Sequence, residues 1–193
     1  MSDPDTQQRI SECGKALAIA SVKAMSIGGT VNLPTMVAGC ARMSGNYLLR
    51  SYKLDLSGVP PGEAVLSEQA GLGNPQLIRF CASVLQSLGT VISNAPSSNL
   101  HDQRAKVKQN FLEAQQALEP VFLPLQAQHS LDHEQMSKAA ALATAILIHQ
   151  FAKHMEPNSG FGYAALGIAE GSQTAPLPYS PGAHAVSQET PSK

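Results

Sequence analysis

The chain has 193 residues, of which 43% are hydrophobic and 14% are charged, and its formal net charge at pH 7 is −1. This length suits one domain with a substantial core, and the near-zero charge provides no global field that would attract nucleic acid or an anionic membrane surface. The charged fraction lies well below the roughly 25% typical of soluble proteins, which favours a surface that is partly covered by a second copy or by a partner.

Apolar residues recur at helical spacing in three segments of the N-terminal half, which predicts three helices there. The first covers about residues 5–27 and ends before a glycine pair, since glycine is common just beyond a helix C-terminus. The second covers about residues 32–54, with Asn32 as its cap. A connector rich in proline and glycine follows, with a short helix at 61–70, and the third helix begins at Asn74.

A loop at residues 94–99 leads to a fourth predicted helix, which begins near Asn99. Pro120 and Pro124 lie within its apolar pattern. Each proline removes a backbone hydrogen bond and clashes with the preceding turn, so this helix is expected to bend or to split into two pieces.

The stretch from Ser130 to Pro157 has the clearest helix start, the clearest stop and the most apolar middle of the chain. Asp132 and Gln135 have the spacing of a capping box, and the residue before Pro157 is disfavoured in a helix, which predicts the end there. Its apolar residues occupy more than one face, and such a helix is usually buried on more than one face. We therefore predict that it is the central helix of a bundle.

Residues 157–193 lack helical periodicity and are rich in Pro, Gly, Ser, Thr and Gln, which predicts a disordered tail. Within it, residues 161–166 are more apolar and form either a loop that packs back on the bundle or a peptide that docks on a partner. The predicted fold is all-α, with a single helical bundle of about five helices over residues 1–156 and a flexible C-terminal tail over 157–193.

The sequence contains no motif for phosphate binding, nucleophilic catalysis or a di-iron centre, so we predict no cofactor and no metal, and an enzymatic role is disfavoured. His129 and His133 are four residues apart but straddle a predicted helix start, so they share a helical face only if that helix begins earlier. Three cysteines lie far apart within apolar patterns, and we interpret them as buried reduced thiols: Cys13, Cys40 and Cys81.

The N-terminus is polar and acidic, unlike a secretion signal, and no uninterrupted apolar stretch of about 20 residues is present to form a transmembrane helix. Together with reduced cysteines, these features favour a cytoplasmic protein.

Two groups of residues are candidates for an interaction surface. Ala41 and Gly45 are small residues on one face of the second helix, and small residues allow close packing against a neighbouring helix. Basic and polar side chains also line the second helix at four-residue steps and crowd the start of the fourth: Arg42, Asn46, Arg50, Arg104, Lys106 and Lys108. One interpretation is that these side chains form solvated helix faces. The other is that the two faces adjoin and bind an acidic protein or a phosphate-bearing ligand. Cations at a helix start oppose the helix dipole, which favours an anionic partner there.

The leading hypothesis is a non-catalytic helical protein that acts by protein–protein association, with a second copy of itself or with another protein. The alternative is a small-molecule-binding or catalytic bundle with an apolar pocket between the second and central helices. Arg42 or His149 would be its polar anchor, and its walls would be Met36, Met43, Tyr47, Leu147 and Phe151. A third hypothesis is membrane association through a helical hairpin at residues 16–41.

Overall fold

The computed structural model describes residues 3–92 and 104–178 of the chain. Over these residues the fold is all-α and contains no β-strand, as predicted. Six long helices and a short helical segment at 104–106 make up this part of the chain, compared with about five helices predicted. The predicted loop at 94–99 and the last residues of the predicted tail, 179–193, lie outside the described residues.

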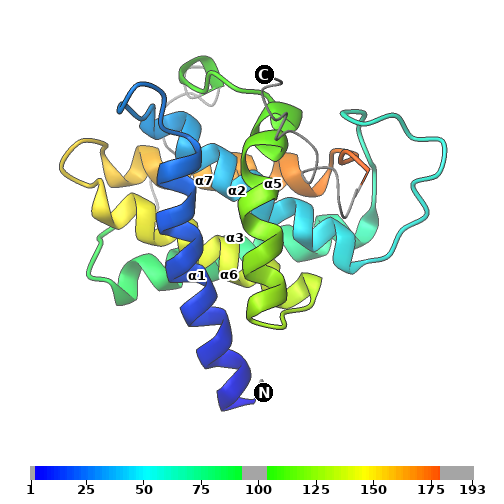
Figure 1. Ribbon diagram of the computed structural model, residues 1–193, viewed down its shortest axis with the longest axis horizontal. Helices are drawn as coiled ribbons and strands as arrows, with labels where there is room; N and C mark the ends of the chain where they lie inside the picture. The colour runs from blue at the N-terminus through cyan, green and yellow to red at the C-terminus, as the bar shows by residue number, and fades with distance from the viewer. Residues whose placement is uncertain (1–2, 93–103, 179–193) are drawn as a thin grey trace, which may run out of the picture.

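The helices form two layers, which Figure 1 shows from the front. Two roughly upright helices cross the front, α1 (Pro4–Ala24) and α5 (Phe111–Gln128). The other helices run behind them in flatter orientations: α2 (Leu33–Ser51), α3 (Glu68–Ser87), α6 (His133–Gln150) and α7 (Pro157–Ser172).

The most enclosed helix is α2. Every residue from Thr35 to Leu49 is buried, because α2 contacts each of the other long helices. Asn32 caps its start as predicted, and its side chain accepts a 2.9 Å hydrogen bond from the backbone N–H of Thr35. This helix, rather than the predicted central helix alone, therefore forms the axis of the bundle.

The predicted central helix is α6, which contacts α1, α2, α3 and α7 and is buried on more than one face. The predicted capping box is present: the Asp132 carboxylate accepts from the Gln135 N–H at 2.8 Å, and the Gln135 side chain accepts from the Asp132 N–H at 3.1 Å. The helix ends at Gln150 rather than near Pro157, and a turn connects it to α7.

The prediction that a tail begins at residue 157 is wrong, because Pro157–Ser172 form α7. Glu156 caps this helix by accepting hydrogen bonds from the backbone N–H groups of Asn158 and Ser159 at 2.9 and 2.7 Å. Its glycines contributed to the composition that predicted disorder, but they let the helix backbone pack directly on α2. Tertiary packing, which stabilises most helices in proteins, here outweighs poor helix propensity.

Two other predicted helix boundaries are also wrong. The third helix does not begin at Asn74, because Ser67 caps α3 and the helix runs through Gly71, Gly73 and Pro75. The predicted helix at 61–70 is therefore absent, and its last residues belong to the first turn of α3.

The predicted helix start near Asn99 lies outside the described residues, and α5 begins at Phe111, after the short helical segment at 104–106. Asn110 and Glu113 form a capping box that fixes this start. Pro120 and Pro124 lie within α5 without splitting it.

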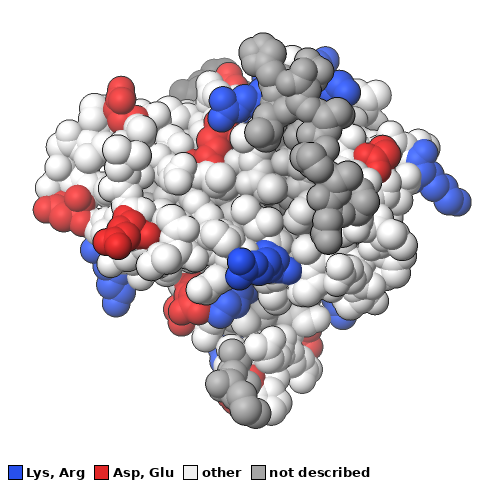
Figure 2. All heavy atoms as spheres, turned by 180° about the vertical axis from the view of Figure 1, so that it is seen from behind, with Lys and Arg blue, Asp and Glu red and all other residues white. Residues whose placement is uncertain are grey.

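Charged side chains are thinly scattered over the molecular surface. Figure 2 shows wide uncharged areas between them on the face opposite to that of Figure 1. Within the residues that the structure describes, no helix has both the length and the apolar character needed to cross a membrane.

Candidate functional site

The small residues of α2 pack against α7 of the same chain. A Cβ atom added at Gly167 would lie 2.8 Å from the Cβ of Ala41, and one added at Gly45 would overlap the backbone of α7 at Ile168 and Gly171. The close packing expected at Ala41 and Gly45 is therefore present, but α7 occupies the face that a partner would need.

The polar residues of α2 are also covered. Arg42 is 6% exposed. Its Nε lies 2.7 Å from a carboxylate oxygen of Glu170, with which it forms an ion pair. Its Nη1 donates a 2.6 Å hydrogen bond to the backbone oxygen of Gln109. Asn46 is fully buried one turn further along the helix. The predicted polar side of this helix is therefore an internal face rather than a solvated one.

Arg42 lies near the basic residues at the start of the fourth predicted helix. Arg42, Arg104 and Lys108 together line a cleft of about 520 Å³, whereas Lys106 is exposed and does not contribute to it. The two predicted basic faces therefore adjoin. Two carboxylates, those of Glu113 and Glu170, also line this cleft and offset much of its positive charge.

The apolar pocket predicted between the second and central helices is filled by its own walls. Met36, Met43, Tyr47 and Leu147 are each fully buried, so they form solid core instead of lining a space. Open clefts occur instead around the C-terminal end of α2.

The larger of these clefts, which we call the apolar cleft, has a volume of about 790 Å³. It lies between the end of α2, the connector that follows it, the end of α5 and the segment 175–178. Its apolar walls include Leu49, Leu54, Leu56, Val59, Leu123, Leu131 and Leu177. Leu49 also belongs to a small hydrophobic cluster with Val65 and Ala175, which supports this side of the molecule apart from the main core.

A short extended segment, 173–178, closes one side of the apolar cleft, and we call it the strap. Backbone hydrogen bonds tie it to the connector: Gly62 N–H donates to the Ala175 oxygen and Ala175 N–H donates to the Glu63 oxygen, each at 2.8 Å. On its other side, Leu177 N–H donates to the side-chain oxygen of buried Gln115 at 2.9 Å. The strap is therefore held from both sides.

Basic side chains gather at one wall of the apolar cleft. Arg50, Lys53 and His133 line it, and within the described residues no Asp or Glu does. Partial burial is the main cause that lowers the pKa of His133, and the charge of Arg50 lowers it further. A hydrogen bond to the Arg50 backbone acts in the opposite direction. The neutral imidazole is therefore favoured beside the two cations.

Arg50 is fixed by two partners. Its Nη2 lies 2.5 Å from a carboxylate oxygen of Glu119 on α5, and its guanidinium carbon lies 5.6 Å from the centre of the Tyr47 ring. The Tyr47 ring also stacks on Phe122 and lies 5.9 Å from the His133 ring. This arrangement anchors the basic wall to the core.

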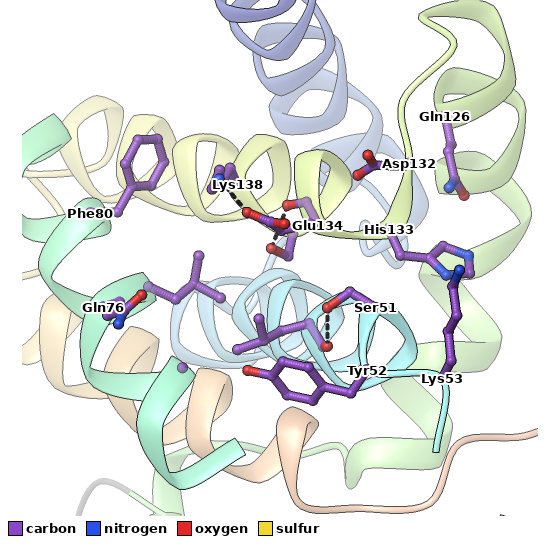
Figure 3. Close-up of a pocket in the computed structure, with 14 residues that line it drawn as sticks. Ser51, Tyr52, Lys53, Gln76, Phe80, Gln126, Asp132, His133, Glu134 and Lys138 are labelled. Carbon is purple, nitrogen blue, oxygen red and sulfur yellow. Dashed lines mark hydrogen bonds and ion pairs between the residues drawn. The ribbon is translucent and has the colours of Figure 1, made fainter. Parts of the chain in front are cut away.

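A second, more polar cleft of about 650 Å³ adjoins the first and shares Lys53, Gln126 and His133 with it. Figure 3 shows Lys53 and His133 at one end of this polar cleft with their side chains directed toward each other, and Phe80 at the other end. Tyr52 lies along its floor, and its hydroxyl occupies the space that a side chain at residue 73 would need.

The other candidate residues are placed as follows. His129 is the C-cap of α5 and His133 is the first residue of α6, so they do not share a helical face. The Thr90 hydroxyl lies 2.8 Å from Nδ1 of His149.

The three cysteines are free and buried, as predicted. Burial raises the pKa of Cys13 and Cys40 to about 11 and that of Cys81 to about 12. These raised pKa values disfavour the thiolate form that a nucleophilic cysteine needs.

Sequence reasoning missed the residues that build the apolar cleft. Lys53 was not among the candidate residues, and the strap lay inside the predicted tail. Gln115 carried no signal, because its importance depends on a contact with Leu177, 62 positions away.

No family model, no curated protein and no solved structure matches this chain. Function is therefore inferred from the geometry of the clefts alone.

Proposed function

We propose that the protein binds a small organic molecule in the apolar cleft and that it acts as a ligand-binding helical protein. The observation that carries this proposal is a cleft of about 790 Å³ with mainly aliphatic walls and a few polar groups gathered at one side. Ligand sites commonly have volumes of about 300–1,000 Å³ with this division between apolar walls and a few orienting polar groups.

The cleft belongs to the folded architecture rather than to a loose loop. Its floor rests on the small hydrophobic cluster around Leu49, and its side is the strap. A cleft with preformed walls loses less conformational entropy when it binds a ligand, which favours affinity.

Protein–protein association remains an expectation from the sequence. Its most specific support was the pair Ala41 and Gly45, and these residues pack against α7. Small-molecule binding is therefore the function that the geometry supports better.

The test uses the full chain and 1-octanol, a neutral molecule with an apolar tail, in isothermal titration calorimetry. Ala127 is an exposed residue near the end of α5 that lines the apolar cleft, so Ala127→Trp should fill the space without burying the indole in the core. Gln128 is the next residue; it is exposed and does not line the cleft, so Gln128→Trp is the matched control.

Saturable binding to the wild-type protein and to Gln128→Trp, with loss of binding in Ala127→Trp, is the expected result. The proposal is overturned if the wild type shows no saturable binding, or if Ala127→Trp binds 1-octanol as well as the wild type does.

A further inference from the structure

Two residues of the apolar cleft have left-handed backbone geometry although neither is glycine. Lys53 has a φ of 52° and Ser130 has a φ of 50°, and they are the two non-glycine residues with positive φ in the described part of the chain. Both line the apolar cleft. L-residues are strained in this region, and retained strain of this kind clusters at functional sites.

Each of these residues follows a helix C-cap, where glycine is the preferred residue. At the end of α5, the N–H groups of Ser130 and Leu131 donate to the carbonyls of Ala127 and Gln126, each at 3.1 Å. The end of α3 has the same pair of bonds, but there the left-handed residue is Gly89, with a φ of 81°. Glycine is thus used at a helix end remote from the apolar cleft and is replaced at both helix ends that form it.

The charges of the cleft distinguish Lys53 from Ser130. Arg50 is already paired with Glu119, whereas Lys53 forms no ion pair with any residue that the structure describes. No described Asp or Glu lines the apolar cleft, whereas Asp132 and Glu134 line the adjoining polar cleft that Lys53 also lines. The Lys53 ammonium is therefore a positive charge without an ion-pair partner at the edge of an apolar space. A ligand anion there would gain an electrostatic partner, and its apolar part would leave water.

We infer that the ligand of the apolar cleft is an amphipathic anion, a carboxylate attached to an apolar chain, and that Lys53 binds the carboxylate. This inference rests on the proposed function and names the ligand class of the same site. Arg50 and His133 complete the wall that faces the anion, and the aliphatic side chains hold the chain.

The inference predicts a rank order for three probes that share one apolar chain and differ in charge. Octanoate should bind most tightly, 1-octanol less tightly and octylammonium least tightly, because the cleft wall attracts the anion and repels the cation. Exposed ion pairs contribute up to about 1 kcal/mol, which corresponds to about fivefold tighter binding of octanoate than of 1-octanol.

Three variants separate the charge of Lys53 from its backbone strain. Lys53→Gly removes the ammonium and relieves the left-handed strain, so its thermal midpoint should rise while its octanoate affinity falls about fivefold toward that of 1-octanol. Lys53→Met keeps the strain and removes the charge, so it should lose octanoate affinity without that rise in midpoint. Ser130→Gly relieves the same kind of strain without removing a charge, so it should raise the midpoint and shows how much of the rise in Lys53→Gly comes from the backbone.

The affinities of all three probes are measured by calorimetry on the full chain at one ionic strength and at pH 7.5. The inference is overturned, with the proposed function intact, if the wild type binds 1-octanol as tightly as octanoate, or if Lys53→Gly and Lys53→Met keep wild-type octanoate affinity. If neither octanoate nor 1-octanol binds the wild type, the proposed function itself fails.

Discussion

The Nε of Arg42 lies 2.7 Å from a carboxylate oxygen of Glu170, which joins the middle of α2 to the last turns of α7. Arg42 is 6% exposed, so its charge has left water and depends on this partner and on the backbone of Gln109. The contact attaches the C-terminal helix to the most buried helix of the fold. It also explains why an arginine is tolerated in a helix that is otherwise enclosed.

Removing the partner of Arg42 should destabilise the protein. Glu170→Ala leaves a nearly buried cation without its counter-charge, and breaking such pairs costs about 3–5 kcal/mol when both members are buried. The Glu170 side chain is 30% exposed, which screens the pair, so we expect about 1–3 kcal/mol in urea denaturation. Glu134→Ala removes an exposed pair with Lys138 and should cost less than about 1 kcal/mol. Equal losses in the two variants would contradict the structural role of the Arg42 pair.

The contact between α2 and α7 should not tolerate a methyl group at Gly45. A Cβ there would overlap the Ile168 carbonyl oxygen and lie 2.7 Å from the backbone nitrogen of Ser172, and neither backbone atom can move away as a flexible side chain could. We expect Gly45→Ala to lower the free energy of unfolding by about 1–3 kcal/mol, the usual cost of overpacking. Gly71→Ala is the control.

Gly71 lies on exposed α3 surface with no atom within 4 Å of an added Cβ, so Gly71→Ala should stabilise the helix by up to about 1 kcal/mol. Urea denaturation of both variants measures the two effects. A Gly45→Ala protein as stable as the wild type would show that α7 does not pack on α2 in this way.

Helix starts that depend on local chemistry could be predicted from the sequence. Asn32 and Asp132 cap helices because each bonds to an N–H three residues ahead, which requires no knowledge of the remaining fold. The helix at Pro157–Ser172 could not be predicted in the same way. Its glycines have poor helix propensity, and only their fit against α2 makes them favourable.

The candidate site depends even more on contacts that are distant in sequence. The strap is ordered by Gly62 and Gln115, and neither residue carries a recognisable motif. The geometry of Lys53 is likewise a property of how α2 ends, since a lysine in the sequence gives no indication of a positive φ. The fold class was therefore accessible from the sequence, whereas the cleft and its basic wall were not.

Acidification should weaken the fold partly through His133. Partial burial and the nearby charge of Arg50 lower the pKa of this imidazole in the folded protein below its ordinary value of 6.5. As the pH falls through 6.5, the unfolded chain takes up a proton that the folded chain does not, so the free energy of unfolding decreases until the pH reaches the lower folded pKa.

His133→Gln should remove this contribution, so the variant should lose less stability than the wild type when urea denaturation is compared at pH 7.5 and at successively lower pH values. The charges that set the shift come from α2 and its end, Arg50 and Lys53, with Asp132 acting in the opposite direction. An unchanged pH dependence in the variant would show that His133 is not perturbed in the folded state.

The strap should loosen when its side-chain partner is removed. Gln115 is fully buried; its side-chain oxygen accepts from Leu177 N–H at 2.9 Å, and its side-chain nitrogen donates to Glu119 at 2.6 Å. Gln115→Leu has similar volume but cannot accept that bond, so the Leu177 amide would be left without its protein partner. An unmade buried hydrogen bond costs about 1–3 kcal/mol. Because the strap is only a few residues long, we expect local opening to absorb most of this cost, with a smaller loss of global stability.

Amide hydrogen exchange measured by NMR distinguishes local opening of the strap from a loss of global stability. The Leu177 amide should exchange much faster in Gln115→Leu than in the wild type, while the Ala175 amide, which bonds to the connector at 2.8 Å, should keep more of its protection. Affinity for 1-octanol should fall in the same variant, because Leu177 forms part of the apolar cleft wall. Unchanged exchange at Leu177 would show that Gln115 does not hold the strap. Faster exchange with undiminished octanol affinity would show that the strap is not a wall of the binding site.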